Sequence, residues 1–298
     1  MKFSNLKFAA MKRLLIFLWL VTSVGAAAQN DSITLAGAHW EKLEIEPGVI
    51  HKKVHFSDNQ LFNSNQYINL IEIEANSQVV AEIIASPELT QTSVLAKQND
   101  AIAAINGSFF KFGLGYNTDD YNSVDYLRKD GVTLAPNTFT DHGIGRAMHQ
   151  KGAIAIFNNK FYILKADRLK EWEKYIQAQE VITSGPLLRI DGTDEPLENS
   201  SFYVTRHPRT AVAKKENGNI IFFTVDGRSP ESNGMSLEEL QKTLRWLGAS
   251  DILNLDGGGS TTMYIYNAPE NGIVNHPTDN RKFDKEGERR VANIIMVK

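Results

Sequence analysis

The chain has 298 residues, of which 42% are hydrophobic, so it is long and apolar enough to bury a sizeable core. Its formal charge is −3 at pH 7 and becomes −7 without the basic leader described next, which argues against nucleic acid as a partner. It contains no cysteine, so an exported form must be stable without disulfides.

The first 28 residues have the pattern of a secretory signal peptide. Four basic residues lie within the first 13 positions, an apolar run covers 14–24, and three alanines follow at 26–28. The apolar run is short for a membrane span. We therefore expect cleavage near Gln29 and a periplasmic or secreted mature protein with no stable membrane span. An uncleaved anchor helix is the alternative, and Met11 is a possible second start.

The next segment, residues 40–84, alternates between apolar and polar residues as strands do. The clearest strands are 67–74 and 79–84. Proline is favoured in the first turn of a helix, so Pro87 predicts a helix that begins after Ser86 and runs to about Lys97. A second apolar run at 101–105 then predicts a strand that ends at Asn106-Gly107-Ser108.

Residues 111–151 show no periodicity and predict a long loop, which in a compact domain is usually functional. Its aromatic residues stand among polar ones, a mixture that suits sugar rings: Phe112, Tyr116, Tyr121 and Tyr126. Solvent-exposed residues without function are the alternative. Strands are expected at 153–157 and 161–164, and a helix over 167–179.

The C-terminal part repeats the order helix, strand, polar turn. A strand at 220–225 ends in Asp226-Gly227-Arg228. Ser236 and Glu239 form a capping box at the start of a helix with a leucine stripe, which Gly248 ends. A last strand at 291–297 is apolar enough to lie inside a sheet.

These elements predict an α+β fold with a mixed, largely antiparallel twisted β-sheet core and a few packed helices. We expect a single domain after the signal peptide at 1–28. Residues 29–99 are its β-rich N-terminal part, and residues 100–298 contain the polar turns.

The most informative turn is Asn254-Leu255-Asp256-Gly257-Gly258-Gly259-Ser260-Thr261-Thr262, hereafter the glycine turn (residues 254–262). Consecutive glycines are costly to order, so they indicate positive φ or a backbone that another group approaches closely. Asp256 lies at the end of a strand, as does the Asn106 turn, and open sheets gather ligand-binding residues at strand ends. Whether the two turns meet is left open by the sequence.

Other polar clusters lie at 183–186, 206–210, 226–228 and 288–293. They place Arg209, Arg228 and Arg289 beside turns or strand ends. A guanidinium group binds phosphate in a bidentate manner, so an anionic ligand is expected even for an acidic protein.

The sequence offers no spacing typical of a metal or nucleotide site, and no Gly-x-Ser-x-Gly elbow of a serine hydrolase. We expect no cofactor and no resident metal, although a divalent ion shared by Asp226 and Asp256 stays open.

Taken in order, the motifs resemble those of the phosphodiester glycosidase family from about residue 100 to the C-terminus. The matching segments are AAINGSFF (103–110), SGPLL (184–188), RHPRTAVA (206–213), VDGR (225–228), NLDGGGSTT (254–262) and ERRVAN (288–293). Two departures are Ser108, where a second glycine is common, and the absence of cysteine-rich appendages, which leaves the sugar and the aglycone open.

The resemblance implies an exported hydrolase that cleaves the bond between a sugar's anomeric carbon and a phosphodiester on a glycan or glycoconjugate. It makes Asp256 the first candidate for the catalytic carboxylate, with Asp226 or Glu288 as the second. Arg209 and Arg228, with amides of the glycine turn, would hold the phosphate. Sugar hydroxyls would bind Asn106, Ser260 and Thr261. The remaining expected binding residues are Gly107, Ser184, Gly185, His207, Thr210, Gly257, Gly258 and Arg289.

Two alternatives remain at this stage. A non-catalytic glycan-binding module accounts for export and for the aromatic loop, but leaves the arginines and acids at strand ends without a role. An ordinary glycoside hydrolase would use two carboxylates and no phosphate-binding arginines.

Overall fold

A computed structural model describes residues 30–113, 116–117, 120–137 and 146–298. The predicted signal peptide and part of the predicted 111–151 loop therefore lie outside the described residues. No helix within the described ranges has the length and apolar character that a bilayer crossing requires.

The largest sheet has eight strands, and every pair of neighbours in it runs antiparallel. Its spatial order is β1 (Glu41–Glu46), β2 (Val49–Leu61), β3 (Ser64–Ile73), β14 (Ile220–Val225), β13 (Arg209–Lys215), β15 (Ala249–Asn254), β11 (Leu187–Ile190) and β12 (Thr193–Asp194). Strands distant in sequence are thus neighbours, and β13 and β15 bring the Arg209 turn next to the glycine turn.

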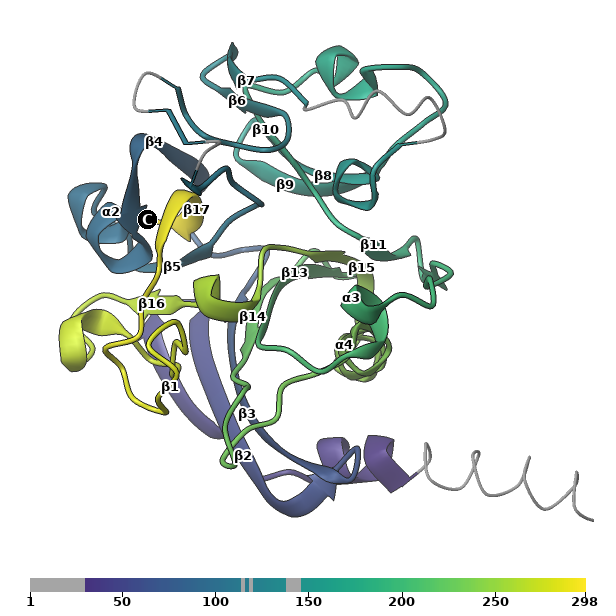
Figure 1. Ribbon diagram of the computed structural model, residues 1–298, viewed down its shortest axis with the longest axis vertical. Coiled ribbons are helices and arrows are strands. Elements are labelled where there is room, and N and C mark those ends of the chain that lie inside the picture. The colour runs from purple at the N-terminus through teal and green to yellow at the C-terminus, as the bar shows by residue number, and fades with distance from the viewer. Residues whose placement is uncertain (1–29, 114–115, 118–119, 138–145) are drawn as a thin grey trace, which may run out of the picture.

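Two smaller antiparallel sheets pack around it, as Figure 1 shows. One has the order β7 (Val132–Ala135), β6 (Leu127–Lys129), β10 (Glu180–Ser184), β8 (Gly152–Phe157) and β9 (Lys160–Lys165). The other has the order β16 (Met263–Ile265), β5 (Ala103–Asn106), β17 (Arg290–Val297) and β4 (Ala81–Gln91). The last strand of the chain, β17, is internal, as its apolar sequence predicts.

The central core lies where the three sheets face one another. Its buried residues come from all three, for example Ile71 on β3, Ile154 on β8 and Ile295 on β17. Burial of large aliphatic side chains contributes roughly 1.5–3 kcal/mol each to stability. Because one core joins the three sheets, the predicted α+β single domain with a largely antiparallel core is confirmed.

The helices cover outer faces of the sheets. The helix α4 (Leu237–Trp246) packs its leucines on the large sheet, together with α3 (Ser201–Val204) and the helical residues 30–36. The capping box predicted for α4 is present: Ser236 accepts a hydrogen bond from the Glu239 amide, and Glu239 accepts one from the Ser236 amide.

The helix predicted from Ser86 to Lys97 is wrong in its first half. There β4 continues to Gln91, and only α2 (Thr92–Gln98) is helical. The pairing of β4 with β17 jumps from Ala85 opposite Asn293 to Thr90 opposite Val291. Residues 86–89 are therefore a bulge, and a bulge tolerates Pro87 because no ladder hydrogen bond is needed there.

The helix predicted over 167–179 is also wrong, because only the 3₁₀ turn η3 (Trp172–Tyr175) forms there. The Asp167 carboxylate accepts a hydrogen bond from the Leu169 amide, and Glu171 has a φ of 57°, so the backbone leaves helical geometry twice. Trp172 is buried against the outer face of the five-stranded sheet.

The predicted unstructured loop at 111–151 is corrected in part. It contains β6, β7 and the 3₁₀ turn η2 (Met148–Gln150). Tyr126 is fully buried and its hydroxyl contacts Arg128 and Thr133, so this ring is part of the core and is not available to a sugar. The other 3₁₀ turns are η4 (Gly258–Ser260) and η5 (Glu270–Gly272).

Candidate active site

The two polar turns that follow β5 and β15 meet. The Asp256 amide donates to the Gly107 carbonyl at 3.1 Å, and Asn106 Nδ2 donates to the Asp256 carbonyl at 2.7 Å. Asn106 Oδ1 accepts from Thr210 Oγ1 at 2.7 Å and from the Thr262 amide at 3.1 Å. Asn106 is fully buried, so its amide joins three segments and fixes the position of Asp256.

Gly107 is a glycine because Asn293 on β17 lies against it. The Gly107 amide donates to the Asn293 carbonyl at 3.0 Å, and the Ser108 amide donates to Asn293 Oδ1 at 2.8 Å. A Cβ at position 107 would overlap Asn293 Oδ1. The AAINGSFF and ERRVAN segments are thus two halves of one contact.

Two guanidinium groups cover the glycine turn. A Cβ at Gly258, which has a φ of 61°, would lie 2.8 Å from Arg228 Nη2. One at Gly259 would lie 2.5 Å from Arg289 Nη2. Arg289 Nε donates to Asp279 Oδ1 at 2.9 Å, whereas Arg228 has no hydrogen-bond or ion-pair partner among the described residues. Each glycine of the run therefore has a close neighbour that leaves no room for a side chain. Gly257 meets the Pro208 carbonyl, Gly258 meets Arg228, and Gly259 meets the Arg289–Asp279 pair.

Asp256 belongs to the same turn, is partly exposed, and lies close enough to both arginines for their charges to act on its carboxyl group. Burial of the carboxyl group among protein atoms raises its pKa to about 6, although Ser260 and Arg289 act in the opposite direction. Two smaller effects also act against burial: the Gly257 amide donates to Asp256 Oδ1 at 2.9 Å, and Arg228 adds a positive charge nearby. The pKa of about 6 includes them. A carboxyl group with this pKa exchanges a proton near neutral pH, as a catalytic acid or base does.

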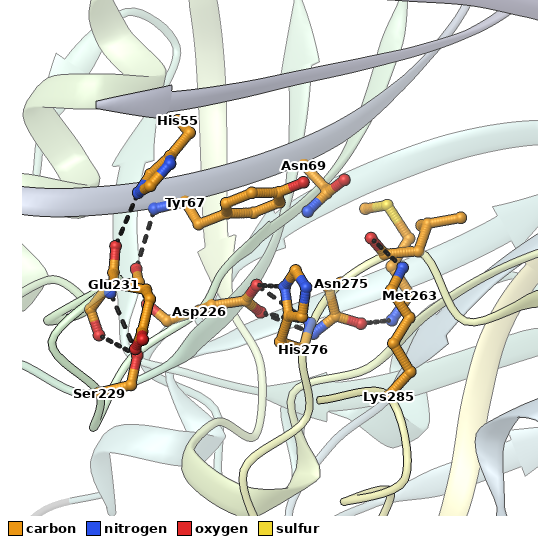
Figure 2. A network of polar contacts seen from close by, with 12 residues as sticks. His55, Tyr67, Asn69, Asp226, Ser229, Glu231, Met263, Asn275, His276 and Lys285 are labelled. Atoms are coloured by element: carbon orange, nitrogen blue, oxygen red, sulfur yellow. Dashed lines mark hydrogen bonds and ion pairs between the residues drawn. The ribbon is translucent and has the colours of Figure 1, made fainter. Parts of the chain in front are cut away.

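Both carboxylate oxygens of Asp226, the next candidate acid, contact polar groups of the protein (Figure 2). Asn275 Nδ2 donates to Oδ1 at 2.9 Å, and the His276 amide and ring nitrogen reach the carboxylate at 3.0 and 2.9 Å. The His276 ring stacks on Phe283 with centroids 3.9 Å apart, and the edge of Tyr67 meets it at 4.8 Å. Asp226 is 1% exposed and holds the segment that leads to Asp279.

Glu288 lies apart from this group, at the start of α2. Its oxygens accept from the Ser93 amide and the Ser93 hydroxyl, both at 2.7 Å. The residue before the helix, Gln91, makes no side-chain cap, so Glu288 takes that role from a distant part of the chain. Burial raises the pKa of Glu288, while the two Ser93 contacts lower it.

Arg209 is 2% exposed, and its guanidinium donates to backbone carbonyls. Nε donates to Met235 at 2.9 Å, and Nη2 donates to Phe202 at 2.8 Å and Thr205 at 3.0 Å. Burial lowers its pKa to about 10. His207 lies beside it, and burial together with Arg209 and Arg228 lowers the pKa of the imidazole.

Pro208 is the point where the loop between β14 and α4 and the glycine turn touch. A Cβ at Gly227 would lie 2.7 Å from Pro208 N, one at Gly234 would lie 2.9 Å from it, and one at Gly257 would lie 2.7 Å from the Pro208 carbonyl. The Gly258 amide donates to that carbonyl at 2.8 Å.

The predicted Ser184-Gly185 turn contacts the strand that precedes Asp256. Ser184 Oγ donates to the Asn254 carbonyl at 3.1 Å, and Asn254 Nδ2 donates to the Gly185 carbonyl at 2.8 Å. The hydroxyls of Thr261 and Thr262 are buried without a hydrogen-bond partner among the described residues. They are therefore buried behind the surface of the turn, and the expected contact of Thr261 with a sugar hydroxyl has no exposed atom to make it.

Sequence reasoning missed Asn275, Asp279 and Asn293, which support Asp226, Arg289 and Gly107. The first two stand in the polar run Asn275-His276-Pro277-Thr278-Asp279, which no periodicity singles out. Asn293 stands in the predicted polar cluster at 288–293, but its contact with Gly107 depends on β17 lying beside β5. In the described ranges, no three His, Asp or Glu side chains gather as metal ligands would.

A carboxyl group with a raised pKa and two guanidinium groups thus share one glycine turn at the end of a β-strand. The phosphodiester glycosidase family model matches residues 99–298, more than half of the chain. The chain therefore belongs to the phosphodiester glycosidase family.

Among individual relatives, the N-acetylglucosamine-1-phosphodiester alpha-N-acetylglucosaminidase of Mus musculus is 33% identical over 118 residues, which cover 39% of this chain and 22% of the mouse protein. The Homo sapiens protein of the same name is 28% identical over 118 residues, with the same coverage. The match thus spans about a fifth of these relatives.

Two solved structures share the fold. One is the zebrafish catalytic domain of that enzyme, described as auto-inhibited by its pro-peptide, with a TM-score of 0.62, 18% identity and 87% coverage of both chains. The other is a hypothetical protein from Synechocystis, with a TM-score of 0.61, 15% identity, and coverage of 87% of this chain and 63% of that one.

Proposed function

We propose that this protein is an exported hydrolase that cleaves the bond between the anomeric carbon of a sugar and a phosphodiester oxygen. The observation that carries the proposal is that Asp256 and the guanidinium groups of Arg228 and Arg289 meet at the glycine turn. Family membership supports the reaction class, and the signal-peptide pattern of residues 1–28 supports export.

The chemistry needs charge neutralisation more than a strong acid. When the bond from the anomeric carbon to the phosphate oxygen breaks, the electron pair stays on the phosphate, and Arg228 and Arg289 stabilise that charge. Asp256 as carboxylate acts on the sugar side, either as the nucleophile or as the base that takes a proton from water. Its pKa of about 6 leaves it ionised at neutral pH and basic enough to accept a proton.

The contacts of the other predicted residues support different proposed roles for them. Asp226 is proposed to position the Asn275–Asp279 segment, because the protein fills its oxygens. Glu288 is proposed to cap α2. Arg228 replaces Arg209 as the first phosphate-binding arginine, because Arg209 donates to three carbonyls whereas Arg228 has no such partner among the described residues.

The test compares a sugar phosphodiester with an uncharged aryl glycoside of the same sugar. The mature protein should release a phosphomonoester from the first and act poorly or not at all on the second. Arg228→Gln should reduce turnover of the phosphodiester about 10- to 100-fold, the range for one charge-assisted hydrogen bond. Arg245→Gln is the control. Arg245 lies on α4, pairs with Asp194 on β12, and is away from the glycine turn.

An equal loss on both substrates would contradict the phosphate role of Arg228. Efficient cleavage of the aryl glycoside alone would identify an ordinary glycoside hydrolase. Sugar binding without cleavage of either substrate would identify a glycan-binding module.

A further inference from the structure

A second polar group, outside the residues used so far, lies next to this site. Asp125 is fully buried, and its Oδ1 contacts His149 Nδ1 at 2.6 Å and accepts from Gln150 Nε2 at 3.2 Å. Burial raises the pKa of Asp125, and the His149 contact lowers it. The His149 side chain is 24% exposed, so the imidazole is held at one nitrogen by a buried carboxyl group and reaches solvent elsewhere.

The backbone of His149 is fixed to the strand that leads to Asp256. A Cβ at Gly185 would lie 3.0 Å from His149 Cα, so the two backbones are in close contact. The Gly185 carbonyl accepts from Asn254 Nδ2 at 2.8 Å, and Asn254 is two residues before Asp256. This places His149 beside the end of β15.

The His149 ring also meets the segment that follows Gly107. Its centroid is 5.7 Å from that of Phe109, and the centroid of Phe109 is 6.3 Å from that of Phe202. All three rings are partly exposed. The Gly107 carbonyl accepts from the Asp256 amide, so His149 is connected to the Asp256 turn from two sides.

The three rings combine the features of a small-molecule subsite. The Arg209 guanidinium lies over one face of the Phe202 ring, 5.1 Å from its centroid, so apolar contact is offered by Phe109 and by the exposed part of Phe202. The His149 imidazole is a polar group of fixed orientation that offers a hydrogen bond. In a histidine whose Nδ1 is occupied by a carboxylate, Nε2 is the atom left to contact a ligand. For comparison, His51 is 7% exposed and its Nε2 contacts Asn69, as expected of a histidine that serves the fold alone.

We propose that Phe109, Phe202 and His149 form the monosaccharide subsite of this enzyme, with Phe109 and Phe202 against the sugar's apolar face. His149 Nε2 hydrogen bonds to a polar substituent of the ring, and Asp125 is a positioning residue that holds the imidazole. The inference rests on the proposed function, since it places the sugar beside Asp256 and the phosphate under Arg228 and Arg289.

The experiment measures binding of two kinds of probe, sugars and a phosphate ester, to the full mature chain by NMR titration. N-acetylglucosamine, glucose and galactose probe the sugar half, and glycerol phosphate probes the phosphate half. His149→Gln and Phe202→Leu should each weaken binding of the preferred sugar about 5- to 10-fold and leave glycerol phosphate unchanged. Arg228→Gln should show the opposite pattern. His39→Gln, an exposed histidine elsewhere, is the control.

The positioning role of Asp125 has its own readout. Asp125→Asn should shift the ¹⁵N resonances of the His149 imidazole toward those of a ring without a carboxylate partner at Nδ1. It should also weaken sugar binding and leave glycerol phosphate binding unchanged. An unchanged His149 spectrum in a folded Asp125→Asn variant would contradict that role.

The subsite is overturned if the wild-type chain binds none of the sugars, or if His149→Gln and Phe202→Leu bind them as the wild type does. Failure of the proposed function looks different: the sugars bind through these residues, but no phosphodiester is hydrolysed. Phe202→Leu keeps the proposal testable if His149→Gln does not fold.

Discussion

At the scale of single residues, Asp256 is the group in which the fold and the chemistry conflict. Its carboxyl group would titrate near 3.8 in an unfolded chain, and the folded protein raises its pKa to about 6. The nearby Arg228 and Arg289 reduce this effect but do not remove it. The protein therefore keeps an unfavourable charge at neutral pH in the position where the proposed reaction needs a base.

The first prediction is that Asp256→Asn folds and loses at least ~100-fold in turnover, the lower range for a positioned acid–base group. The acid limb of the wild-type activity profile should have an apparent pKa near 6, because protonation removes the base. Steady-state kinetics between pH 4 and pH 8 checks both. A folded and nearly fully active variant would assign the chemistry to another carboxylate.

The second prediction concerns stability and the same substitution. Because the pKa of Asp256 is higher in the folded than in the unfolded chain, the folded state binds more protons between about pH 4 and pH 6. The group thus destabilises the fold at neutral pH, and this penalty fades as pH falls. Asp256→Asn should raise Tm at pH 7 and lose that advantage near pH 4, as thermal melts at the two pH values would show.

The third prediction concerns Arg209. Its guanidinium donates to the carbonyls of Met235, Phe202 and Thr205, so its interactions support the backbone. Lysine keeps the charge but cannot make these three contacts. Arg209→Lys should lower Tm and reduce activity on charged and uncharged substrates alike. A loss confined to phosphodiesters, with an unchanged Tm, would restore a direct phosphate role for Arg209.

At the scale of elements, α2 shows how the segment before β17 supports the site. The helix has only seven residues and is capped by Glu288, which directly precedes Arg289 in sequence. A short helix depends on its cap and its packing rather than on propensity. The cap therefore also fixes the position of Arg289 and the point where the chain enters β17.

The fourth prediction tests that assignment with Glu288→Gln and Ser93→Ala. Each should lower the free energy of unfolding by about 1 kcal/mol, the usual cost of a lost cap, and leave kcat within about threefold of the wild type. Denaturant unfolding and kinetics on the same samples decide it. A loss of two powers of ten in kcat for Glu288→Gln, without loss of stability, would make Glu288 a catalytic residue.

The elements also show what the sequence can and cannot predict. The strands at 153–157 and 220–225 and the capping box at Ser236 are local signals, and the structure contains all of them. Pro87 misled the prediction of a helix, because a bulge and a helix start tolerate proline for the same reason, the missing N–H. Only the pairing of β4 with β17 distinguishes the two.

The candidate site was predictable to a similar extent. Asp256 and Arg228 stand in motifs with glycine, and glycine marks the close approaches that the structure contains. The support from Asn293 and Asp279 depends on contacts between distant segments, which no local pattern encodes. Arg209 could not be separated from Arg228 by sequence, because both are arginines beside turns and only burial distinguishes them.

At the scale of the whole molecule, one core joins three sheets, and the N-terminal segment is part of the fold. Leu35 in the helical residues 30–36 is 2% exposed and packs with the residues under α4. Asp31 Oδ1 accepts from the Phe62 amide at 2.9 Å, at the turn between β2 and β3. The helical residues 30–36 are therefore part of the core of the described fold.

The fifth prediction concerns the N-terminus of the exported protein and the contribution of residues 30–36 to stability. Protein from the exported fraction should begin near Gln29 by N-terminal sequencing, and intact Met1 or Met11 there would contradict it. A chain that starts at Asn30 should keep its Tm. One that starts at Gly37 should lose about 2 kcal/mol of unfolding free energy, mainly through the loss of Leu35 burial.

The contact of Gly227, Gly234 and Gly257 with Pro208 has a consequence for how such a protein can diverge. The loop that contains Gly227 and Gly234 and the glycine turn both pack against the backbone of His207 and Pro208, so neither can be redirected without displacing this shared support. Substitutions in the two segments should therefore show strong epistasis, and evolution has to change them together or leave them alone.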